Sequence, residues 1–467
     1  MDSLRLPLSA DRGQPDGAAA AATVVVIGTV VSLALGFVSA GCHQFDDVTR
    51  YLVARWAWSD PRHLLGDWAH PGFMILYVLP ARFGWHAARA LSALLTGATG
   101  WLAFSIAREL RIGSAWLAAL ATWVQPLVFI LSLTTLSETV AAFYLAAAVL
   151  LALRGRWTAS AAVLSLLLTA RSESIILVPI WIGWALSQRA RVWRLWPIIW
   201  APLVVIVAQT LSGMPRSFAT YLNPRPISHP EVSGALTLFS RLLESHGPAV
   251  AMLGLAGLAP LARSRRAWPL AAILALFIVS QGVVRFFGLY IAGRIYPRQL
   301  VPMSPVIAVA ATALWADLRE RGRARRAALG ALGVATLLLW VAMERQLHLP
   351  EPPIYVLPVH IGKWLVRVSA GAVLLSVAAL LGAPRRAGIG SGELRRRRRP
   401  ARSAGRFTRC VCSPVDQVID AGNWLDAHGY RDRPAGHVAR LSGFFSRPRR
   451  TASMPQPVRP DRRRPER

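Results

Sequence analysis

The chain has 467 residues, of which 54% are hydrophobic, and carries a formal net charge of +30. Its mean hydropathy of +0.41 comes from uncharged stretches of about 18 to 25 residues, each long enough to cross a hydrocarbon core of ~30 Å, which excludes an ordinary soluble protein. The arginines form short clusters between these stretches and in the C-terminal region, a distribution that membrane-helix orientation explains. We therefore expect no nucleic-acid partner.

The apolar stretches, taken in chain order, predict an all-α polytopic membrane protein. The first stretch, 18–42, is too long for the hydrophobic core of a signal peptide, so we interpret it as a retained span. The segment 71–83 is apolar but brief, and a re-entrant or interfacial position suits it. About twelve transmembrane helices are expected, at 20–41, 85–107, 114–132, 136–153, 157–170, 174–188, 195–212, 247–262, 268–288, 299–316, 327–343 and 361–382.

Arginine clusters lie on alternate connections between these spans, beginning at Arg108, Arg154, Arg189, Arg263 and Arg319. By the positive-inside rule, these connections and both termini are cytoplasmic. The expected organisation is a cytoplasmic N-terminus at 1–19, a multi-span membrane domain at 20–383 and an Arg- and Pro-rich cytoplasmic tail at 384–467. The low apolar content of the tail predicts disorder, and the whole chain is expected in a bacterial plasma (inner) membrane.

The opposite, outer side holds longer connections at 42–84, 213–246, 289–298 and 344–360. In the first of these, a helix over 48–58 would place Val48, Tyr51 and Trp56 on one face and Arg50 elsewhere. That pattern is typical of an interfacial helix at the outer membrane surface. A simple extension of the first span is the alternative.

Ionisable residues in or beside membrane spans are costly, so they are candidates for function. Four clusters of them fall on the expected outer side. The first is Asp46 and Asp47, directly after the first span. Two adjacent carboxylates could hold a proton, a metal ion or another cation, and Arg50 could hold one of them. They could equally cap the following helix.

The second cluster is His70 in a His-Pro-Gly turn, which could also be only a structured turn. The third brings together Glu138, at the start of one span, and Arg171 and Glu173, between two others. Both glutamates could be N-terminal helix charges that suit the helix dipole. Arg171 is positive on the outer side, against the orientation rule, and needs an anionic partner.

The fourth cluster is Arg294, Tyr296 and Arg298, followed by prolines that loosen the first turns of the span over 299–316. Arginine binds phosphate in bidentate fashion, which makes this cluster a candidate phosphate site. The alternative is that these long side chains simply extend to the membrane surface.

The order of these motifs resembles that of the C-type (GT-C) integral membrane glycosyltransferases, in the bacterial branch of protein mannosyltransferases and aminoarabinose transferases. The resemblance covers roughly residues 20–320. The large soluble domain usual after the last helix has no counterpart in this sequence, and the Arg-Tyr motif is spaced differently. The matching motifs are the acidic pair Asp46-Asp47, the turn His70-Pro71-Gly72 and Ser137-Glu138. The stretch Thr169-Ala170-Arg171-Ser172-Glu173 loosely matches the family's Thr-Arg-x-Glu element, and the stretch from Arg294 through Tyr296 to Pro302 corresponds to its Arg-Tyr-x-x-Pro stretch.

The resemblance implies a GT-C-like fold and a glycosyltransferase that moves a mannose-like sugar, or another hexose or pentose, from a polyprenyl-phosphate donor to an acceptor hydroxyl. The reaction would occur at the outer membrane face with inversion, and Asp46, or less favourably Asp47, would act as base. The resemblance implies no definite cofactor, and Asp46 and Asp47 are the candidate ligands if a divalent metal takes part. The expected donor-binding residues are Arg50, His70, Glu138, Arg171, Glu173, Arg294, Tyr296 and Arg298.

The expected partners are membrane lipids, the lipid-linked donor and an acceptor that is a lipid, a protein or a polysaccharide. A transporter or flippase of lipid-linked sugars and a polysaccharide ligase are the alternatives. Transporters usually place ionisable residues near the bilayer midplane, on broken helices. Here the polar clusters gather at one face, which favours chemistry at the membrane surface.

Overall fold

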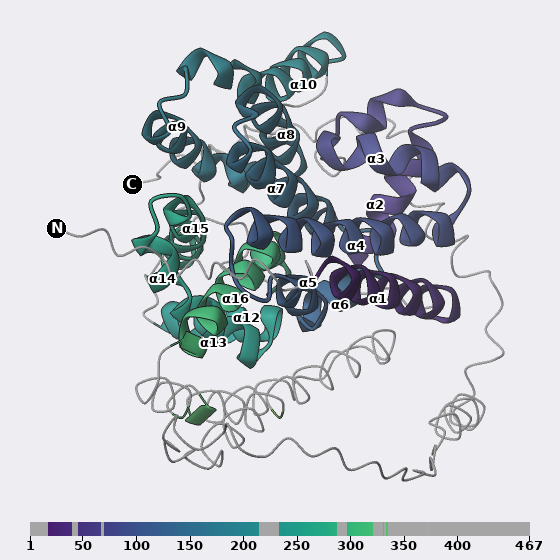
Figure 1. Cartoon of the computed structure of the whole chain (residues 1–467). Coiled ribbons are helices and arrows are strands. Elements are labelled where there is room, and N and C mark those ends of the chain that lie inside the picture. The colour runs from purple at the N-terminus through teal and green to yellow at the C-terminus, as the bar shows by residue number, and fades with distance from the viewer. Residues whose placement is uncertain are drawn as a thin grey trace, which may run out of the picture. The chain divides into compact units, whose positions relative to one another are not determined.

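The computed structural model describes residues 17–39, 45–66, 70–213, 233–286 and 297–320, with the isolated residues 330, 333, 334 and 371. The chain divides into a unit Met1–Arg385 and a second unit, Arg386–Arg467, which holds none of the described residues. The described residues form helices and no strand (Figure 1). Apart from those isolated residues, the expected spans 327–343 and 361–382, the connection 344–360 and the tail lie outside the described part of the chain.

Four described helical segments are long and apolar enough to cross a membrane: Ala18–Val38, Trp85–Glu109, Val192–Leu211 and Pro297–Leu318. Shorter apolar helical segments accompany them at Ser137–Leu153, Trp157–Ala170, Ser172–Ser187, Pro248–Arg263 and Trp268–Gln281. The prediction of an all-α polytopic membrane protein is therefore confirmed. The count of about twelve spans stays a prediction.

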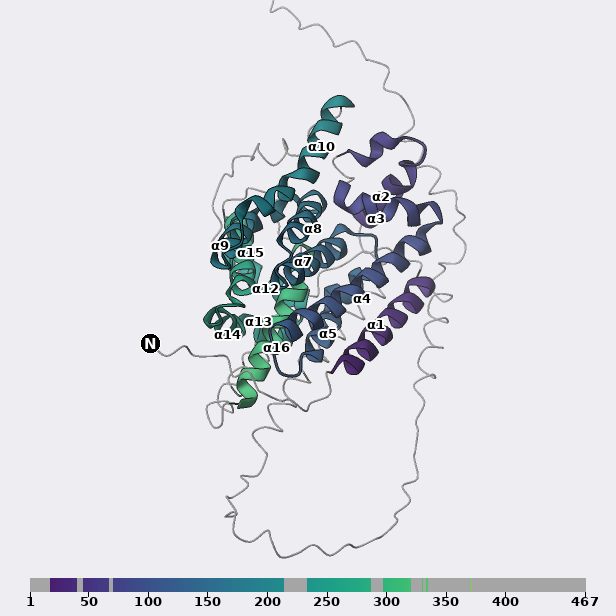
Figure 2. The same cartoon turned by 45° about the horizontal axis from the view of Figure 1, so that its top comes forward.

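The first span, α1 (Ala18–Val38), packs beside α4 (Trp85–Glu109), and both views show the two helices side by side (Figures 1 and 2). Glycines allow this close approach, as is common between membrane helices. A Cβ atom at Gly97 would lie 2.3 Å from the hydroxyl of Thr29. The opposite face of α1 exposes valines such as Val26 and Val30, as expected for a surface that contacts lipid.

Prolines and one glycine break several expected spans into shorter helices. The span over 114–132 is α5 (Trp116–Trp123) and α6 (Pro126–Leu131), because Pro126 has no N–H to continue the helix. The span over 247–262 breaks at Gly257, where a Cβ atom would lie 2.0 Å from the carbonyl oxygen of Ala310. The resulting pieces are α13 (Pro248–Ala256) and α14 (Leu258–Arg263), η2 (Ser172–Leu177) and α9 (Val178–Ser187), and η3 (Val192–Ile199) and α10 (Trp200–Leu211), where η denotes a 3-10 helix.

The expected interfacial helix is α2 (Phe45–Trp56), and it is no extension of α1, because Ser39 ends α1 in an extended conformation. A short 3-10 helix, η1 (Pro61–Leu64), follows it. The apolar segment 71–83 forms α3 (Pro71–Arg82), which is too short to cross a bilayer. It packs instead against α2, α4 and α8 (Trp157–Ala170).

The core of the first unit is α7 (Ser137–Leu153), which packs between α4 and α8, together with α16 (Ser304–Glu320). The 3-10 helix η4 (Pro297–Met303) leads into α16. The helix α15 (Trp268–Phe286) packs beside α16. One helix, α12 (Ser233–His246), lies within the connection 213–246, where the sequence analysis placed no helix. It packs against α6, α15 and η4.

Candidate active site

Segments from four parts of the chain bring their ionisable residues together at one end of the helices. Arg298 of η4 donates a hydrogen bond to Asp46 of α2, although 252 positions separate them. The Nε atom of Arg298 also lies 3.5 Å from Oε1 of Glu138, at the start of α7. Arg171, at the end of α8, donates to the same oxygen at 2.9 Å and to Oε1 of Glu173 at 2.6 Å. Carboxylates and guanidiniums thus alternate through the cluster.

Glu138 lies at the centre of this cluster and is fully buried. Its position in the first turn of α7 suits the positive end of the helix dipole. A buried carboxylate is costly unless it is paired, and Arg171 and Arg298 supply that pairing. Its second oxygen, Oε2, has no hydrogen-bond partner in the described part of the chain.

The two adjacent aspartates have different surroundings. Asp47 is fully buried, and its carboxylate accepts hydrogen bonds from the backbone N–H and the hydroxyl of Thr135, each at 2.6 Å. The Asp46 side chain is 22% exposed and faces Arg298. The pair therefore does not converge on one point, and no group of three or more metal-binding side chains occurs among the described residues.

Arg89, which was not among the residues predicted from the sequence, holds the loop before α7 in place. It is buried in α4 and donates to the carbonyl oxygens of Leu133 and, at 2.6 Å, of Ser39. Ser92, one turn further along α4, donates to the carbonyl of Thr134. The signal in the sequence was a charged residue near the start of a predicted span. These contacts fix where α7 begins, and thereby where Glu138 lies.

Arg50 is the most conspicuous cation of the cluster, because it is 4% exposed and its Nε and NH1 atoms have no hydrogen-bond partner in the described residues. Its guanidinium carbon lies 5.9 Å from the ring centre of Phe73. Burial lowers the pKa of Arg50 to about 10, although the nearby negative charge of Glu138 acts to raise it. The guanidinium therefore stays protonated at neutral pH. A buried cation of this kind is stabilised by an anion.

His70 precedes α3 in a left-handed conformation, with φ of 46°. Its carbonyl accepts the N–H of Phe73 at 2.7 Å, and Pro71 at the first helical position suits a helix start. Burial, and then the positive charges of Arg50, Arg171 and Arg298, hold the pKa of His70 well below its ordinary value. Its imidazole is therefore neutral near pH 7. Of the predicted site residues, only Arg294 and Tyr296 lie outside the described residues.

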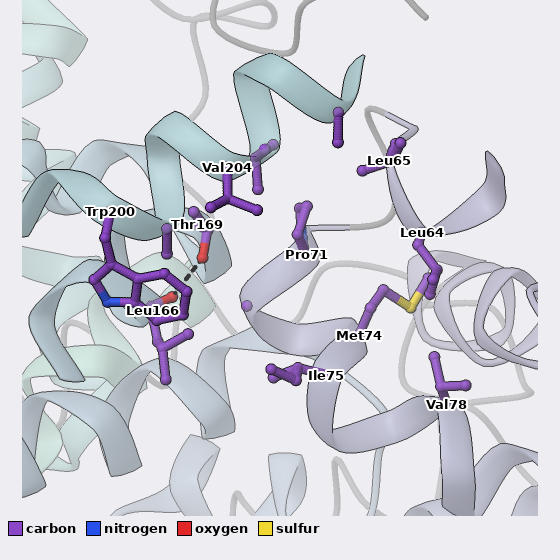
Figure 3. A pocket seen from close by; sticks show the side chains of 14 residues that line it. Leu64, Leu65, Pro71, Met74, Ile75, Val78, Leu166, Thr169, Trp200 and Val204 are labelled. Carbon is purple, nitrogen blue, oxygen red and sulfur yellow. Dashed lines mark hydrogen bonds between the residues drawn. The ribbon is translucent and has the colours of Figure 1, made fainter. Parts of the chain in front are cut away.

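An apolar cavity of about 350 Å³ adjoins this turn, between α3, α8 and α10. Figure 3 shows Trp200 and Val204 of α10 on one side and Met74 of α3 on the other, with Pro71 at the beginning of α3. Thr169, two residues before Arg171, also lines it. The lining residues are Leu64, Leu65, Pro71, Gly72, Met74, Ile75, Val78, Leu166, Thr169, Trp200, Ala201, Val204, Val205 and Ala208.

The C-terminal end of α12 fixes both ends of η4, the segment that carries Arg298. Ser245 donates from its hydroxyl to the carbonyl of Pro297 at 2.7 Å. The Nδ1 atom of His246 lies 2.5 Å from Oε1 of Gln125, and the amide nitrogen of Gln125 donates to the carbonyl of Ser304 at 3.0 Å. No sequence motif indicated this connection, because its partners are backbone carbonyls and one amide.

The fold is that of a polytopic membrane protein of the GT-C type, as its similarity to solved structures shows. Two solved structures of ArnT from Cupriavidus metallidurans are similar to this chain, each at 16% sequence identity. The apo structure has a TM-score of 0.51 and covers 77% of this chain and 75% of that chain. The structure bound to undecaprenyl phosphate has a TM-score of 0.50 and covers 76% of this chain and 71% of that chain.

No family model matches the sequence, and no curated protein sequence matches it. The similarity to ArnT at 16% identity is therefore a similarity of fold. The GT-C-like fold that the order of motifs predicted is confirmed, and so is the resemblance to the aminoarabinose transferase branch at the level of the fold.

Proposed function

We propose that the protein is a membrane glycosyltransferase that moves a sugar from a polyprenyl-phosphate donor to an acceptor hydroxyl. The observation that carries this proposal is the buried guanidinium of Arg50, whose Nε and NH1 atoms have no hydrogen-bond partner among the described residues. It lies beside a cluster of paired arginines and carboxylates. An anionic phosphate at this place would compensate that charge. The presence of undecaprenyl phosphate in the ArnT structure of the same fold supports the class of donor.

The arginines divide into two groups with different partners. Glu138 and Glu173 hold Arg171, and Asp46 and Glu138 hold Arg298. The guanidinium of Arg50 lies above the Phe73 ring, and its Nε and NH1 atoms, which have no hydrogen-bond partner among the described residues, can donate to a ligand. Arginine suits phosphate because its planar donors match two phosphate oxygens, and it would stabilise the charge that develops on the departing phosphate. Glu138 and Glu173 orient arginines in this proposal and do not touch the donor.

The base in this proposal is Asp46. Its carboxylate is partly exposed and oriented by Arg298, whereas the carboxylate of Asp47 is buried and occupied by Thr135. The acceptor hydroxyl would give its proton to Asp46 while its oxygen forms the new bond to the sugar carbon. The bond from that carbon to the phosphate oxygen breaks, and its electrons leave with the polyprenyl phosphate. Attack from the opposite side inverts the anomeric centre.

The apolar cavity between α3, α8 and α10 is where the hydrocarbon next to the phosphate would lie. It begins at Pro71, directly after His70, and its lining is apolar apart from Thr169. Burial of isoprene carbons there would contribute about 25 cal/mol for each Å² removed from water. This end of the helices would face the outer side of the plasma membrane, as the arginine clusters at the other end predict.

The test is sugar transfer from a purified polyprenyl-phosphate sugar by wild type, Asp46→Asn and Asp47→Asn at matched amounts, together with binding of undecaprenyl phosphate. Asp46→Asn keeps the size of the side chain, so we expect normal lipid binding and turnover that is about 10²–10⁴-fold lower. Asp47→Asn should reduce the amount of folded protein, because Asp47 connects α2 to Thr135. Wild-type turnover by Asp46→Asn would contradict the proposal.

Arg50→Gln tests the phosphate site separately. It should weaken binding of undecaprenyl phosphate by about tenfold or more, as expected for loss of one charge-assisted contact. Arg55→Gln, in the same helix but hydrogen-bonded to Tyr51, is the control and should bind normally. A protein that moves the lipid-linked sugar across the membrane without forming a new glycosidic bond would instead be the flippase that the sequence left open.

A further inference from the structure

A second polar hollow lies at the other end of the helices. It has a volume of about 340 Å³ and is lined by Ser187, Gln188 and Arg189, at the end of α9, and by Arg265 and Arg266, between α14 and α15. The segment η2–α9 begins next to Arg171 and ends at this hollow, so the hollow and the Asp46–Arg298 cluster lie at opposite ends of that segment. Residues from two distant parts of the chain thus place three guanidiniums around one concave surface.

The charges at this hollow do not balance within the described part of the chain. Arg266 lies 2.6 Å from Glu109, and the same carboxylate is 3.8 Å from Arg154. The single negative charge of Glu109 is therefore shared between Arg266 and Arg154. Neither Arg189 nor Arg265 forms an ion pair with another described residue. Orientation of the membrane helices explains why arginines occur in these loops, but it does not explain why they converge on one hollow.

The surface that leads to the hollow is apolar. Ile182 and Leu186 lie one turn apart on α9 and are 37% and 56% exposed, and Leu186 directly precedes the hollow. On the following segment, Trp193 and Trp196 are exposed as well. Exposed tryptophans are typical of the boundary between hydrocarbon and headgroups. The hollow is therefore at the depth where phospholipid headgroups lie.

We propose that this hollow binds the phosphodiester headgroup of an anionic diacyl phospholipid in the leaflet opposite the active site. Arg189 and Arg265 contact the phosphate, and the acyl chains lie along the apolar face of α9 that ends at Leu186. Basic pockets between helices on the cytoplasmic side are where such headgroups bind. The exposed apolar face favours a lipid over a free phosphate ion, because only the lipid has hydrocarbon chains that can contact that face.

The experiment titrates purified full-length protein in detergent with dioleoyl phosphatidylglycerol, and separately with dioleoyl phosphatidylcholine, and counts bound lipid by native mass spectrometry. The variant is Arg189→Gln/Arg265→Gln. The control, Arg191→Gln/Arg263→Gln, removes the same charge at exposed positions two residues away from Arg189 and Arg265, and neither position lines the hollow. We expect the first variant to bind phosphatidylglycerol about 30-fold more weakly and the control to change less than about threefold.

Each other outcome contradicts the proposal. Equal weakening in both variants would mean general attraction between charges, and no weakening in either would mean that there is no site. Equal binding of phosphatidylcholine would remove the need for an anionic headgroup. Inorganic phosphate that displaces the lipid and binds as tightly would assign the hollow to a free anion. The assay contains no sugar donor, so its result is independent of the proposed transferase activity.

Discussion

Arg171, at the end of α8, donates a 2.9 Å hydrogen bond to the buried carboxylate of Glu138, at the start of α7. This contact joins two helices at the level where the candidate site lies. The same carboxylate oxygen lies 3.5 Å from Arg298, so Glu138 holds two arginines that come from opposite halves of the chain. Among the described residues, Glu138 is therefore the carboxylate that both arginines share.

Glu138→Gln should destabilise the protein strongly, because it leaves Arg171 and Arg298 buried without that negative charge. Removing one partner of a buried ion pair typically costs about 3–5 kcal/mol. Glu173→Gln is the matched control, since Glu173 is 22% exposed and Arg171 keeps Glu138. Its cost should be about 1 kcal/mol or less. Thermal unfolding midpoints in detergent measure both, and equal midpoints would refute the central role of Glu138.

Gly72→Ala should also destabilise the protein and disturb the apolar cavity. A Cβ atom at Gly72 would lie 2.2 Å from the carbonyl oxygen of Leu166 in α8, so α3 must move away. The expected cost is about 1–3 kcal/mol. Gly36→Ala in α1 is the control, because its Cβ would meet nothing within 4 Å and alanine favours a helix. If both variants unfold at the wild-type midpoint, the close α3–α8 contact is absent in solution.

His70 should make the protein less stable at mildly acidic pH. Burial and neighbouring arginines lower its pKa in the folded state, so below about pH 6.5 the unfolded chain binds a proton that the folded chain does not. Stability is therefore lost as the pH falls, by at most about 1.4 kcal/mol per pH unit. Unfolding midpoints from pH 8 to pH 5 should fall more steeply for wild type than for His70→Gln. Parallel profiles would contradict this assignment.

The fold was largely predictable from the sequence, because uncharged stretches of membrane-spanning length have few alternatives to helices. The expected spans 20–41 and 85–107 match α1 and α4 closely. The breaks within the other spans were less predictable. Gly257, for example, ends α13 where its backbone meets Ala310, and that contact depends on a helix about fifty positions away in sequence.

The candidate site was partly predictable for a different reason. A charge near a membrane span is conspicuous, so Glu138, Arg171 and Arg298 could be identified one by one. Their pairing could not, because it depends on how α7, α8 and η4 converge. The difference between Asp46 and Asp47 was likewise hidden, since it arises from a contact with Thr135 across the fold.

The orientation of the chain can be tested with single cysteines in a background that lacks Cys42, Cys410 and Cys412. Ser59 is exposed after α2, and Ser187 is exposed at the end of α9. The arginine clusters predict that Ser59→Cys reacts with an impermeant maleimide on whole cells and that Ser187→Cys reacts only after permeabilisation. The reverse pattern would show that the chain is inserted the other way round.

The last prediction concerns α12, which fixes η4 through Ser245 and His246. If this contact positions Arg298, then Ser245→Ala should lower the kcat for sugar transfer by about 10–100-fold, because small misplacements of a site residue have effects of that size. The donor KM should change less than about twofold, since Arg50 is untouched. Ser245→Thr restores a hydroxyl and should recover much of the rate. Ser280→Ala, which removes a similar hydroxyl contact to Phe277 in α15, is the control and should keep wild-type kinetics. A Ser245→Ala protein that unfolds at a lower temperature but turns over normally would show that α12 only stabilises the fold.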